Sequence, residues 1–303
     1  TQYSYEATKQ DIVLQTKEDF ITYLKNRRNT IVHQNAVKLF QKQYDDSKNF
    51  YEQGIRVALN NLLEVEIELL QAKQRLLTSK SAQRIAQEEL FNTMGLRSTE
   101  NIDEVQIEKN ENILGTFDRK DLLNRNEIKA LLMHKESLEN SKRSVKGNFY
   151  PKVDANLKHK RYGDSFALNE KDGSYDPQNV GTITFSWNLY NGGKDESDMV
   201  VYRHQMSQVN SQISNLKLKI YLQYSNAKEQ YILTSENLKI SNKALDQSRV
   251  NYEIVDNRFK EGVSTSKDLI DANYLLTQAQ ENYYTAYYDK LLAKATLERI
   301  FEK

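Results

Sequence analysis

Two acidic residues, Asp268 and Asp271, have a spacing that could gather negative charge on one part of the protein. They lie three residues apart and shortly after Gly262, so a helix that begins there carries both carboxylates on one face. Neighbouring carboxylates repel one another and attract cations, so a functional role is one interpretation. The simpler alternative is that acidic residues near a helix N-terminus stabilise the helix dipole. The spacing alone leaves both interpretations open.

Residue patterns typical of enzymes do not occur in the sequence. The four histidines have no carboxylate or histidine neighbour at metal-ligand spacing, and the absence of Cys excludes thiolate ligands, disulfides and a cysteine nucleophile. The serines and threonines lack a paired base. The Gly192-Gly193 pair reads as the end of a strand and not as a phosphate-binding loop. We therefore predict no enzyme activity, no catalytic residue, no metal site and no cofactor.

The composition favours long helices that each bury one stripe of apolar side chains. Only 38% of the 303 residues are hydrophobic, 28% are charged, and mean hydropathy is -0.77. Disorder is not favoured, because 10% of the residues are aromatic and the apolar positions are periodic. The net charge of +1 gives no electrostatic argument for a nucleic-acid partner. No apolar run approaches the roughly 18–20 residues of a membrane helix.

An internal repeat organises the chain. The stretch from Asn49 to Gly54 resembles the stretch from Asn257 to Gly262, and the match continues for about thirty residues in total. Gly and Pro are absent from 194–261, where apolar residues recur at steps of three, four and seven. We predict helices near 5–52, 57–95, 125–147, 195–260 and 265–301, with each repeat forming an antiparallel hairpin that turns at Gly54 or Gly262. We interpret a run of four tyrosines as helix packing: Tyr283, Tyr284, Tyr287 and Tyr288.

Two segments between the hairpins alternate with period two and predict antiparallel strands near 150–162 and 179–190. Each is about ten residues long, which is the length of a tilted membrane strand. Such an apolar face needs lipid, another sheet or other subunits, and a small soluble hairpin packed on a helix stays open as the alternative. The apolar row comprises Ile183, Phe185, Trp187 and Leu189, which would face lipid under the membrane interpretation. Trp187, Tyr190 and Tyr150 are typical of aromatics at a membrane interface, with core packing as the alternative.

Several motifs occur in the order found in one known family. Phe149-Tyr150-Pro151 precedes the first strand, and the second strand lies within 180–193, which ends in Asn191-Gly192-Gly193. The segment Asn124-Arg125-Asn126-Glu127-Ile128 looks like a helix start of the form Asn-Arg-Pro-Glu-Leu. Arg258-Phe259, Gly262, Ser266 and the run 268–272 resemble a helix-turn signature. Together these motifs resemble the TolC-family outer-membrane efflux proteins.

The resemblance implies a mainly α fold with long coiled-coil hairpins in two tandem repeats, plus a strand pair that contributes to a trimeric outer-membrane β-barrel. It implies a first-repeat hairpin at 1–96, an equatorial linker and short helix at 97–148, the strand pair with an extracellular loop at 149–193, and a second-repeat hairpin at 194–303. The first repeat lacks a preceding helix and strand pair, so we expect an N-terminally truncated member. Three copies would then supply six strands in place of twelve. Thr1 is not an initiator Met and no signal peptide follows it, so a mature form or a fragment is expected.

The resemblance also implies a function. We expect a passive export duct of a tripartite efflux or type I secretion system, a homotrimer in outer-membrane lipid with a periplasmic helical extension. An inner-membrane pump would supply energy, and a periplasmic adaptor would dock at the turns around Gly54 and Gly262. The implied channel constriction comprises Asp268, Asp271, Phe259 and Ser264. The alternative is a periplasmic coiled-coil adaptor or structural interaction protein, although the lipoyl-like and β-barrel domains of an adaptor are not evident.

Phe259 and Ser264 depart from the residues found at the matching positions of some family members. Phe259 stands in place of a Tyr that links neighbouring helices, and Ser264 in place of an Arg. In the first repeat, the position equivalent to Asp268 is occupied by the uncharged Asn60 or Asn61. We therefore expect closure in this chain to depend more on packing than on polar links.

Overall fold

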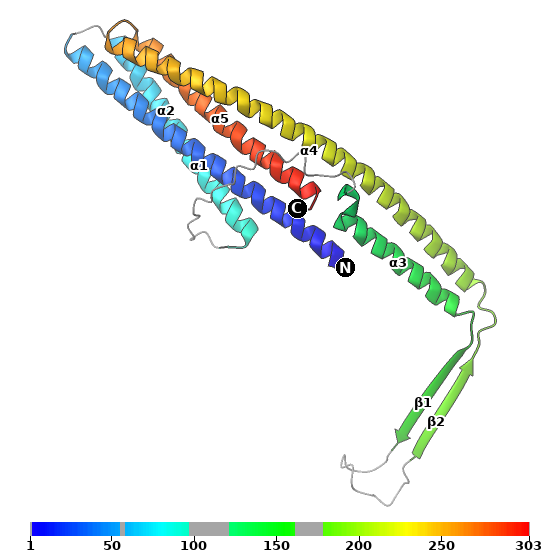
Figure 1. The fold of residues 1–303 in the computed structure, drawn as a ribbon. Coiled ribbons are helices and arrows are strands. Elements are labelled where there is room, and N and C mark those ends of the chain that lie inside the picture. Colours follow the sequence, from blue (N-terminus) through cyan, green and yellow to red (C-terminus); the bar gives the residue numbers. More distant parts are fainter. Residues whose placement is uncertain (1, 55–57, 97–120, 161–177, 303) are drawn as a thin grey trace, which may run out of the picture. The chain divides into compact units, whose positions relative to one another are not determined.

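The computed structural model describes residues 2–54, 58–96, 121–160 and 178–302 of the chain (Figure 1). The five predicted helices and the strand pair are all present among them. The helices are α1 (Gln2–Glu52), α2 (Leu59–Met94), α3 (Asn126–Gly147), α4 (Lys194–Lys260) and α5 (Ser266–Ile300), with a 3-10 turn at Asp121–Asn124; the strands are β1 (Lys152–Lys160) and β2 (Gln178–Ser186). The irregular linker expected at 97–117 and the loop expected between the strands fall outside the described residues.

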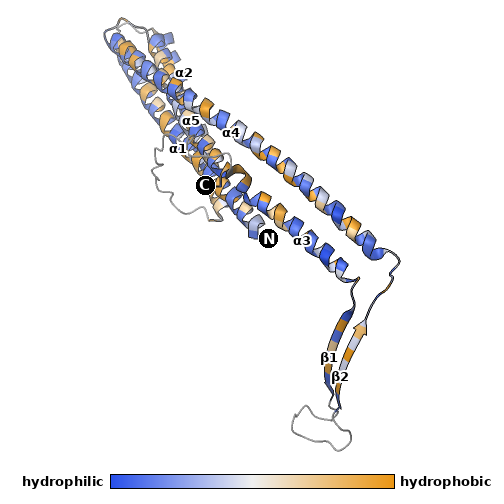
Figure 2. Cartoon of the chain, turned by 45° about the vertical axis from the view of Figure 1, so that its right-hand side comes forward, coloured by the Kyte–Doolittle hydropathy of each residue, from blue (hydrophilic) through white to orange (hydrophobic). Residues whose placement is uncertain are grey.

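The chain divides into two compact units, 1–127 with 217–303, and 128–216. In the first unit, α1 packs lengthwise against both α2 and α5, and the second half of α4 runs along the same bundle (Figure 1). Among the described residues, its core includes several separate small clusters. Phe40 packs with Leu69 and Ala72, and Leu245 packs with Leu276 and Ala279. This is the expected outcome when each helix contributes one apolar stripe, which is visible as spaced hydrophobic residues in Figure 2.

Polar contacts join the two repeats along the antiparallel pair of α1 and α5. The Lys25 ammonium lies 2.9 Å from the Asp289 carboxylate, and the Arg28 guanidinium donates to the Tyr284 hydroxyl over 2.7 Å. Nearby, Tyr283 and Tyr284 make an edge-to-face ring contact with their centroids 5.1 Å apart. Tyr283 also packs against the cluster that contains Leu245, and Tyr288 packs against the cluster that contains Leu24. The predicted role in helix packing is thus confirmed for these two tyrosines.

In the second unit, β1 and β2 form an antiparallel hairpin whose register brings the two apolar rows onto one face. Val153 pairs with Phe185, and Ala155 pairs with Ile183. Side chains opposite each other in an antiparallel pair lie on the same side of the sheet, so the alternation predicted from the sequence is confirmed.

The second strand is shorter than predicted. It ends at Ser186, which pairs with the first residue of β1, Lys152. The preceding residue, Pro151, has no backbone N–H and lies just after the end of α3, so no strand residue stands opposite Trp187. Trp187 and Leu189 therefore lie beyond the strand and not within it, which corrects the predicted bound of 190.

Candidate functional site at the helical turns and on the strand pair

The turn between α4 and α5 is built around Gly262, as the sequence predicted. Gly262 has φ +74°, its N–H donates to the Phe259 carbonyl over 2.9 Å, and the Val263 N–H donates to the Arg258 carbonyl over 2.8 Å. This pair of bonds is the Schellman motif, which ends a helix at a residue in the left-handed region. Gly54 has φ +66° at the corresponding end of α1, and its N–H donates to the Tyr51 carbonyl over 3.0 Å. Both repeats thus end their first helix at a glycine in the left-handed region.

The ends of α1 and α4 lie together within the first unit. Phe259, only 6% exposed, makes an edge-to-face contact with Phe50, with the ring centroids 6.0 Å apart. Its side chain therefore packs within its own chain. Ser264 is half-buried, and its N–H donates to the Arg258 carbonyl over 3.2 Å. Ser264 thereby extends the turn around Gly262.

Asp268 has a local structural partner at the start of α5. The Thr265 N–H and the Thr265 hydroxyl each donate to the Asp268 carboxylate over 2.8 Å, and the Thr265 hydroxyl accepts from the Asp268 N–H over 3.2 Å. This reciprocal arrangement is a capping box. The backbone and side-chain hydrogen bonds from Thr265 lower the pKa of Asp268. Asp271 is exposed one turn later, so both carboxylates remain accessible from solvent.

A buried amide contact behind the turn was not predicted from the sequence. The Gln43 side chain of α1, 2% exposed, donates to the Ser266 carbonyl over 3.0 Å. The Asn273 side chain of α5, 1% exposed, donates to the Gln43 side-chain oxygen over 2.8 Å. The contact fixes the first turns of α5 against α1. The only available signal was the presence of two amides at positions that periodicity assigns to the core.

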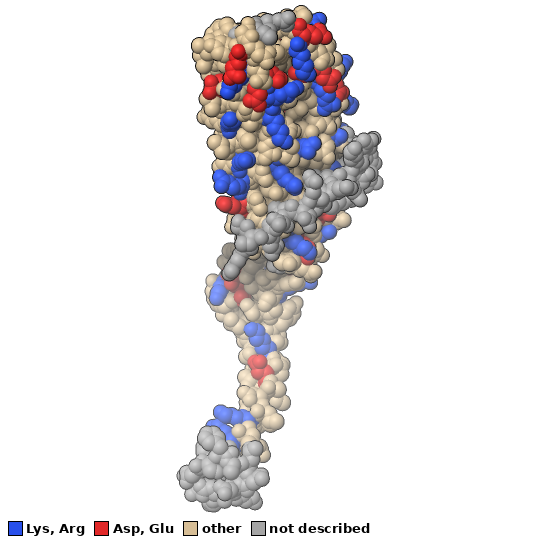
Figure 3. Space-filling model, turned by 90° about the vertical axis from the view of Figure 1, so that its left-hand side faces the viewer, with Lys and Arg blue, Asp and Glu red and all other residues tan. Residues whose placement is uncertain are grey.

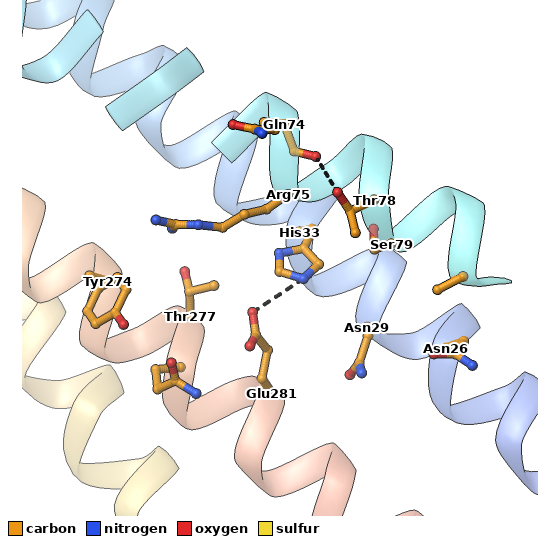
Figure 4. A pocket seen from close by; sticks show the side chains of 12 residues that line it. Asn26, Asn29, His33, Gln74, Arg75, Thr78, Ser79, Tyr274, Thr277 and Glu281 are labelled. Carbon is orange, nitrogen blue, oxygen red and sulfur yellow. Dashed lines mark hydrogen bonds and ion pairs between the residues drawn. The ribbon is translucent and has the colours of Figure 1, made fainter. Parts of the chain in front are cut away.

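A polar hollow of about 540 Å³ lies between α1, α2 and α5 (Figure 4). His33 and Glu281 face each other within it, 3.4 Å apart, and the Arg75 guanidinium lies 5.7 Å from the centre of the Tyr274 ring. His33 thus has a carboxylate partner that local spacing did not reveal. Among the described residues no group of three His, Cys, Asp or Glu side chains could hold a metal ion.

On the strand pair the predicted row is exposed. Ile183 is 80% and Phe185 67% exposed, and neither is covered by a helix of the chain. Trp187 and Leu189 are also exposed beyond the end of the strand, and the Trp187 indole donates to the Phe149 carbonyl over 3.2 Å. No helix among the described segments is long and apolar enough to cross a membrane.

The helices and the strand pair define a class of channel protein with two long α-helical hairpins and a β-hairpin. A family model described as outer membrane efflux protein matches residues 119–301. The chain belongs to this family, and it is an outer-membrane efflux channel protein with a periplasmic helical region and not an enzyme. This family membership decides between the channel and the adaptor left open by the sequence.

Solved structures show the same fold at low sequence identity. The outer membrane protein VceC of Vibrio cholerae is 14% identical with a TM-score of 0.77, and the match covers 99% of this chain and 72% of that one. The CmeC outer membrane channel of Campylobacter jejuni is 13% identical with a TM-score of 0.78, covering 99% and 64%. The open state of the MtrE outer membrane channel of Neisseria gonorrhoeae is 15% identical with a TM-score of 0.70, covering 99% and 71%. No curated protein matched the chain.

Proposed function

We propose that the chain is the passive duct of a tripartite export system and that it works as a homotrimer. The observation that carries this proposal is the amount of apolar surface that the single chain leaves uncovered. An exposed apolar stripe runs along α2 at helical steps of four, four, three and seven: Leu59, Leu63, Ile67, Leu70 and Leu77. Each of these side chains is 48–68% exposed. A second row on α4 comprises Leu218, Leu222, Leu233 and Ile240, which are 54–68% exposed.

Further copies of the chain are the proposed cover for these stripes. A monomer rarely exposes apolar rows of this length, and heptad-like spacing is the pattern that packs against another helix. A closed ring of copies buries the α2 stripe of each chain against a neighbour and encloses a tunnel. We propose three copies, because membership of this channel family implies a trimer.

Lipid is the proposed cover for the strand face. Ile183 and Phe185 stand on one side of the hairpin with their cross-strand partners, while Thr184 and Ser186 stand on the other. In a barrel wall the apolar side faces the acyl chains and the polar side faces the lumen. The exposed Trp187 and Leu189 then continue the apolar row toward the interface.

The helical turns are the proposed periplasmic end. The region around Gly54 and Gly262 is the proposed docking site for a periplasmic adaptor, which would connect the duct to an energy-supplying inner-membrane pump. Asp268 and Asp271, exposed just after the second turn, are the proposed carboxylate ring of the constriction. Phe259 and Ser264 support that ring through packing and backbone bonding.

The oligomer and the channel are tested together in reconstituted membranes. We expect native mass spectrometry to show a trimer and planar bilayers to show conductance. Leu70→Asp should abolish the trimer, because it places a charge in the α2 stripe. Gln71→Asp adds the same charge at an exposed position one residue further around the helix and should leave the trimer intact. A monomeric wild-type chain in lipid, or equal effects of the two substitutions, would overturn the proposal.

A further inference from the structure

We propose that the polar hollow between α1, α2 and α5 is a binding site for a neutral saccharide. Its volume of about 540 Å³ is within the range of small-molecule sites in proteins, roughly 300–1,000 Å³. Such sites are usually lined mainly by apolar side chains. Among the 12 described residues that line this hollow, only Ala82 has a side chain that is a hydrocarbon group alone. This lining favours a ligand that is polar over its whole surface.

The three hydroxyl side chains of the hollow are held as hydrogen-bond acceptors. Each donates its proton to a backbone carbonyl of its own helix, over 3.2 Å from Thr78, 2.9 Å from Ser79 and 2.9 Å from Thr277. A hydroxyl has one proton and two lone pairs, so each oxygen can still accept a hydrogen bond. The hydroxyls come from α2 and α5, which form two walls of the hollow.

Gln278 and Glu281 add acceptors on the α5 wall. The Gln278 amide donates to the Asn282 side-chain oxygen over 3.2 Å, so its own oxygen remains available. The half-buried Glu281 carboxylate meets His33 over 3.4 Å and keeps lone pairs beyond this contact (Figure 4). Together with the three hydroxyls, these groups make the hollow rich in acceptors. A ligand that fits it must therefore carry several hydrogen-bond donors.

Arg75 supplies donors from the α2 wall. Its guanidinium donates to the Gln71 side-chain oxygen over 3.2 Å, and a guanidinium has five N–H groups, so others remain for a ligand. The guanidinium lies 5.7 Å from the centre of the Tyr274 ring, and Tyr274 is 47% exposed. The Tyr274 ring thus offers an apolar surface beside the polar groups, on which the C–H face of a sugar ring can pack.

A neutral ligand is favoured over a charged one. Arg75 repels a cation, and Glu281 repels an anion. On the face drawn in Figure 3, Lys and Arg side chains gather over the middle of the helices, while Asp and Glu gather toward the turns, so the surroundings do not attract a cation either. A sugar hydroxyl both donates and accepts, so one ring with several hydroxyls can bond to the acceptors and to Arg75 together.

The cover proposed for the α2 stripe leaves the hollow free. At 100° per residue, Arg75 and Ser79 lie about 140° or more around α2 from Leu70 and Leu77. A neighbouring copy that packs on the stripe therefore contacts a different side of α2. The hollow is built from three helices of one chain, so a ligand needs no second copy to bind.

The α5 wall of the hollow lies on the same side of α5 as Asp271. Tyr274 and Gln278 line the hollow and follow Asp271 after three and seven residues, which are steps along one helix face. Because Asp271 belongs to the proposed constriction, the hollow opens toward the proposed tunnel. That placement rests on the proposed function, whereas binding of the saccharide does not depend on it.

The test uses the full chain in detergent and saturation-transfer-difference NMR. The probes are four neutral disaccharides, maltose, cellobiose, lactose and diacetylchitobiose, each at about 10 mM so that millimolar dissociation constants are detected. We expect saturation transfer to at least one of them. Thr78→Val together with Thr277→Val removes two acceptors of the hollow and should weaken binding about tenfold.

The matched control is Thr16→Val together with Thr296→Val. These hydroxyls also donate to carbonyls of their own helices, over 2.8 Å and 3.0 Å, but they do not line the hollow. The control variant should bind as the wild type does. Circular dichroism of both variants serves as the check on folding.

Three results would overturn the inference. The first is the absence of saturation transfer to all four disaccharides, and the second is an equal loss of binding in the two variants. The third is transfer to glucuronate with none to the neutral sugars, which would indicate an anion site at Arg75. Native mass spectrometry measures the trimer separately, so a failure of saccharide binding in an intact trimer counts against this inference and not against the proposed duct.

Discussion

The Arg299 guanidinium, near the end of α5, lies 2.9 Å from the Glu127 carboxylate in the first turn of α3. The same guanidinium lies 2.7 Å from the Asp11 carboxylate of α1, and the Arg125 guanidinium donates to Glu127 over 3.0 Å. The side chain of Arg299 is only 7% exposed. The segment that resembled a family helix start therefore has a structural role here, because its acidic residue ties the beginning of α3 to α5.

The Glu127 contact makes stability depend on pH. Burial alone would raise the pKa of Glu127, but hydrogen bonds and charge from Arg125, with a hydrogen bond from Arg299, lower it to about 2. A pKa below the unfolded value of about 4.3 stabilises the fold above that pH, and the contribution is lost as the pH falls toward 2. Glu127→Gln should therefore lower the free energy of unfolding at pH 7 by up to about 3 kcal/mol.

Urea unfolding followed by circular dichroism between pH 2 and pH 7 measures this effect. The difference between wild type and Glu127→Gln should shrink below pH 4 and vanish near the folded pKa. Glu139→Gln removes an exposed partner of Arg143 on the same helix and should change stability little. A difference for Glu127→Gln that stays constant over the whole pH range would contradict the prediction.

The buried contact between Gln43 and Asn273 should show strong coupling. Gln43→Leu leaves the Ser266 carbonyl and the Asn273 amide without this partner and should cost about 1–3 kcal/mol. The double variant Gln43→Leu with Asn273→Leu removes both amides and should cost less than the sum of the single changes. A double-mutant cycle by chemical denaturation measures the coupling, and strictly additive losses would show that the two amides do not act together.

Gly54 should be sensitive to the addition of a single methyl group. A Cβ at this position meets no atom within 4 Å, so the cost comes only from the backbone at φ +66°. Gly54→Ala should destabilise the first hairpin by about 1 kcal/mol. Gly147→Ala is the matched control, because it also has open space but no positive φ, and it should be neutral or stabilising. Thermal denaturation that ranks the two variants equally would contradict this explanation.

The sequence was sufficient to predict where the helices begin and end, because helix ends depend on local chemistry. The stretch without Gly or Pro before Gly262 predicted α4 almost to the residue. The end of β2 was not predictable in this way, since Ser186 is the last paired residue only because its partner strand begins after Pro151. The contact of Arg299 with Glu127 spans 172 residues, and local spacing carries no signal for such a pair.

Phe185 and Thr184 provide a test of which strand face meets lipid. Phe185→Arg should cost roughly 2–4 kcal/mol in membrane stability if the residue lies near the bilayer midplane. Thr184→Arg places the same side chain on the opposite face and should be tolerated, because that face is predicted to line the lumen. Folding into lipid vesicles, followed by the shift in electrophoretic mobility, measures both. Normal assembly of Phe185→Arg would reject the lipid-facing assignment.

The proposed carboxylate ring should make the channel sensitive to block by multivalent cations. Three copies of Asp268 and Asp271 would concentrate negative charge in a narrow opening, so divalent or trivalent cations should block current through the reconstituted channel. Because hydrogen bonds from Thr265 lower the pKa of Asp268, this carboxylate should remain charged, and the block should persist, in mildly acidic buffer. Asp268→Asn together with Asp271→Asn should abolish the block. The helix start should survive, since Asn keeps a side-chain oxygen that can accept from Thr265.

Phe259→Leu and Ser264→Ala should change resting conductance only modestly, because Phe259 packs on Phe50 and Ser264 bonds through its backbone. An unchanged block in the double variant would show that Asp268 serves only to cap α5 and that the constriction lies elsewhere.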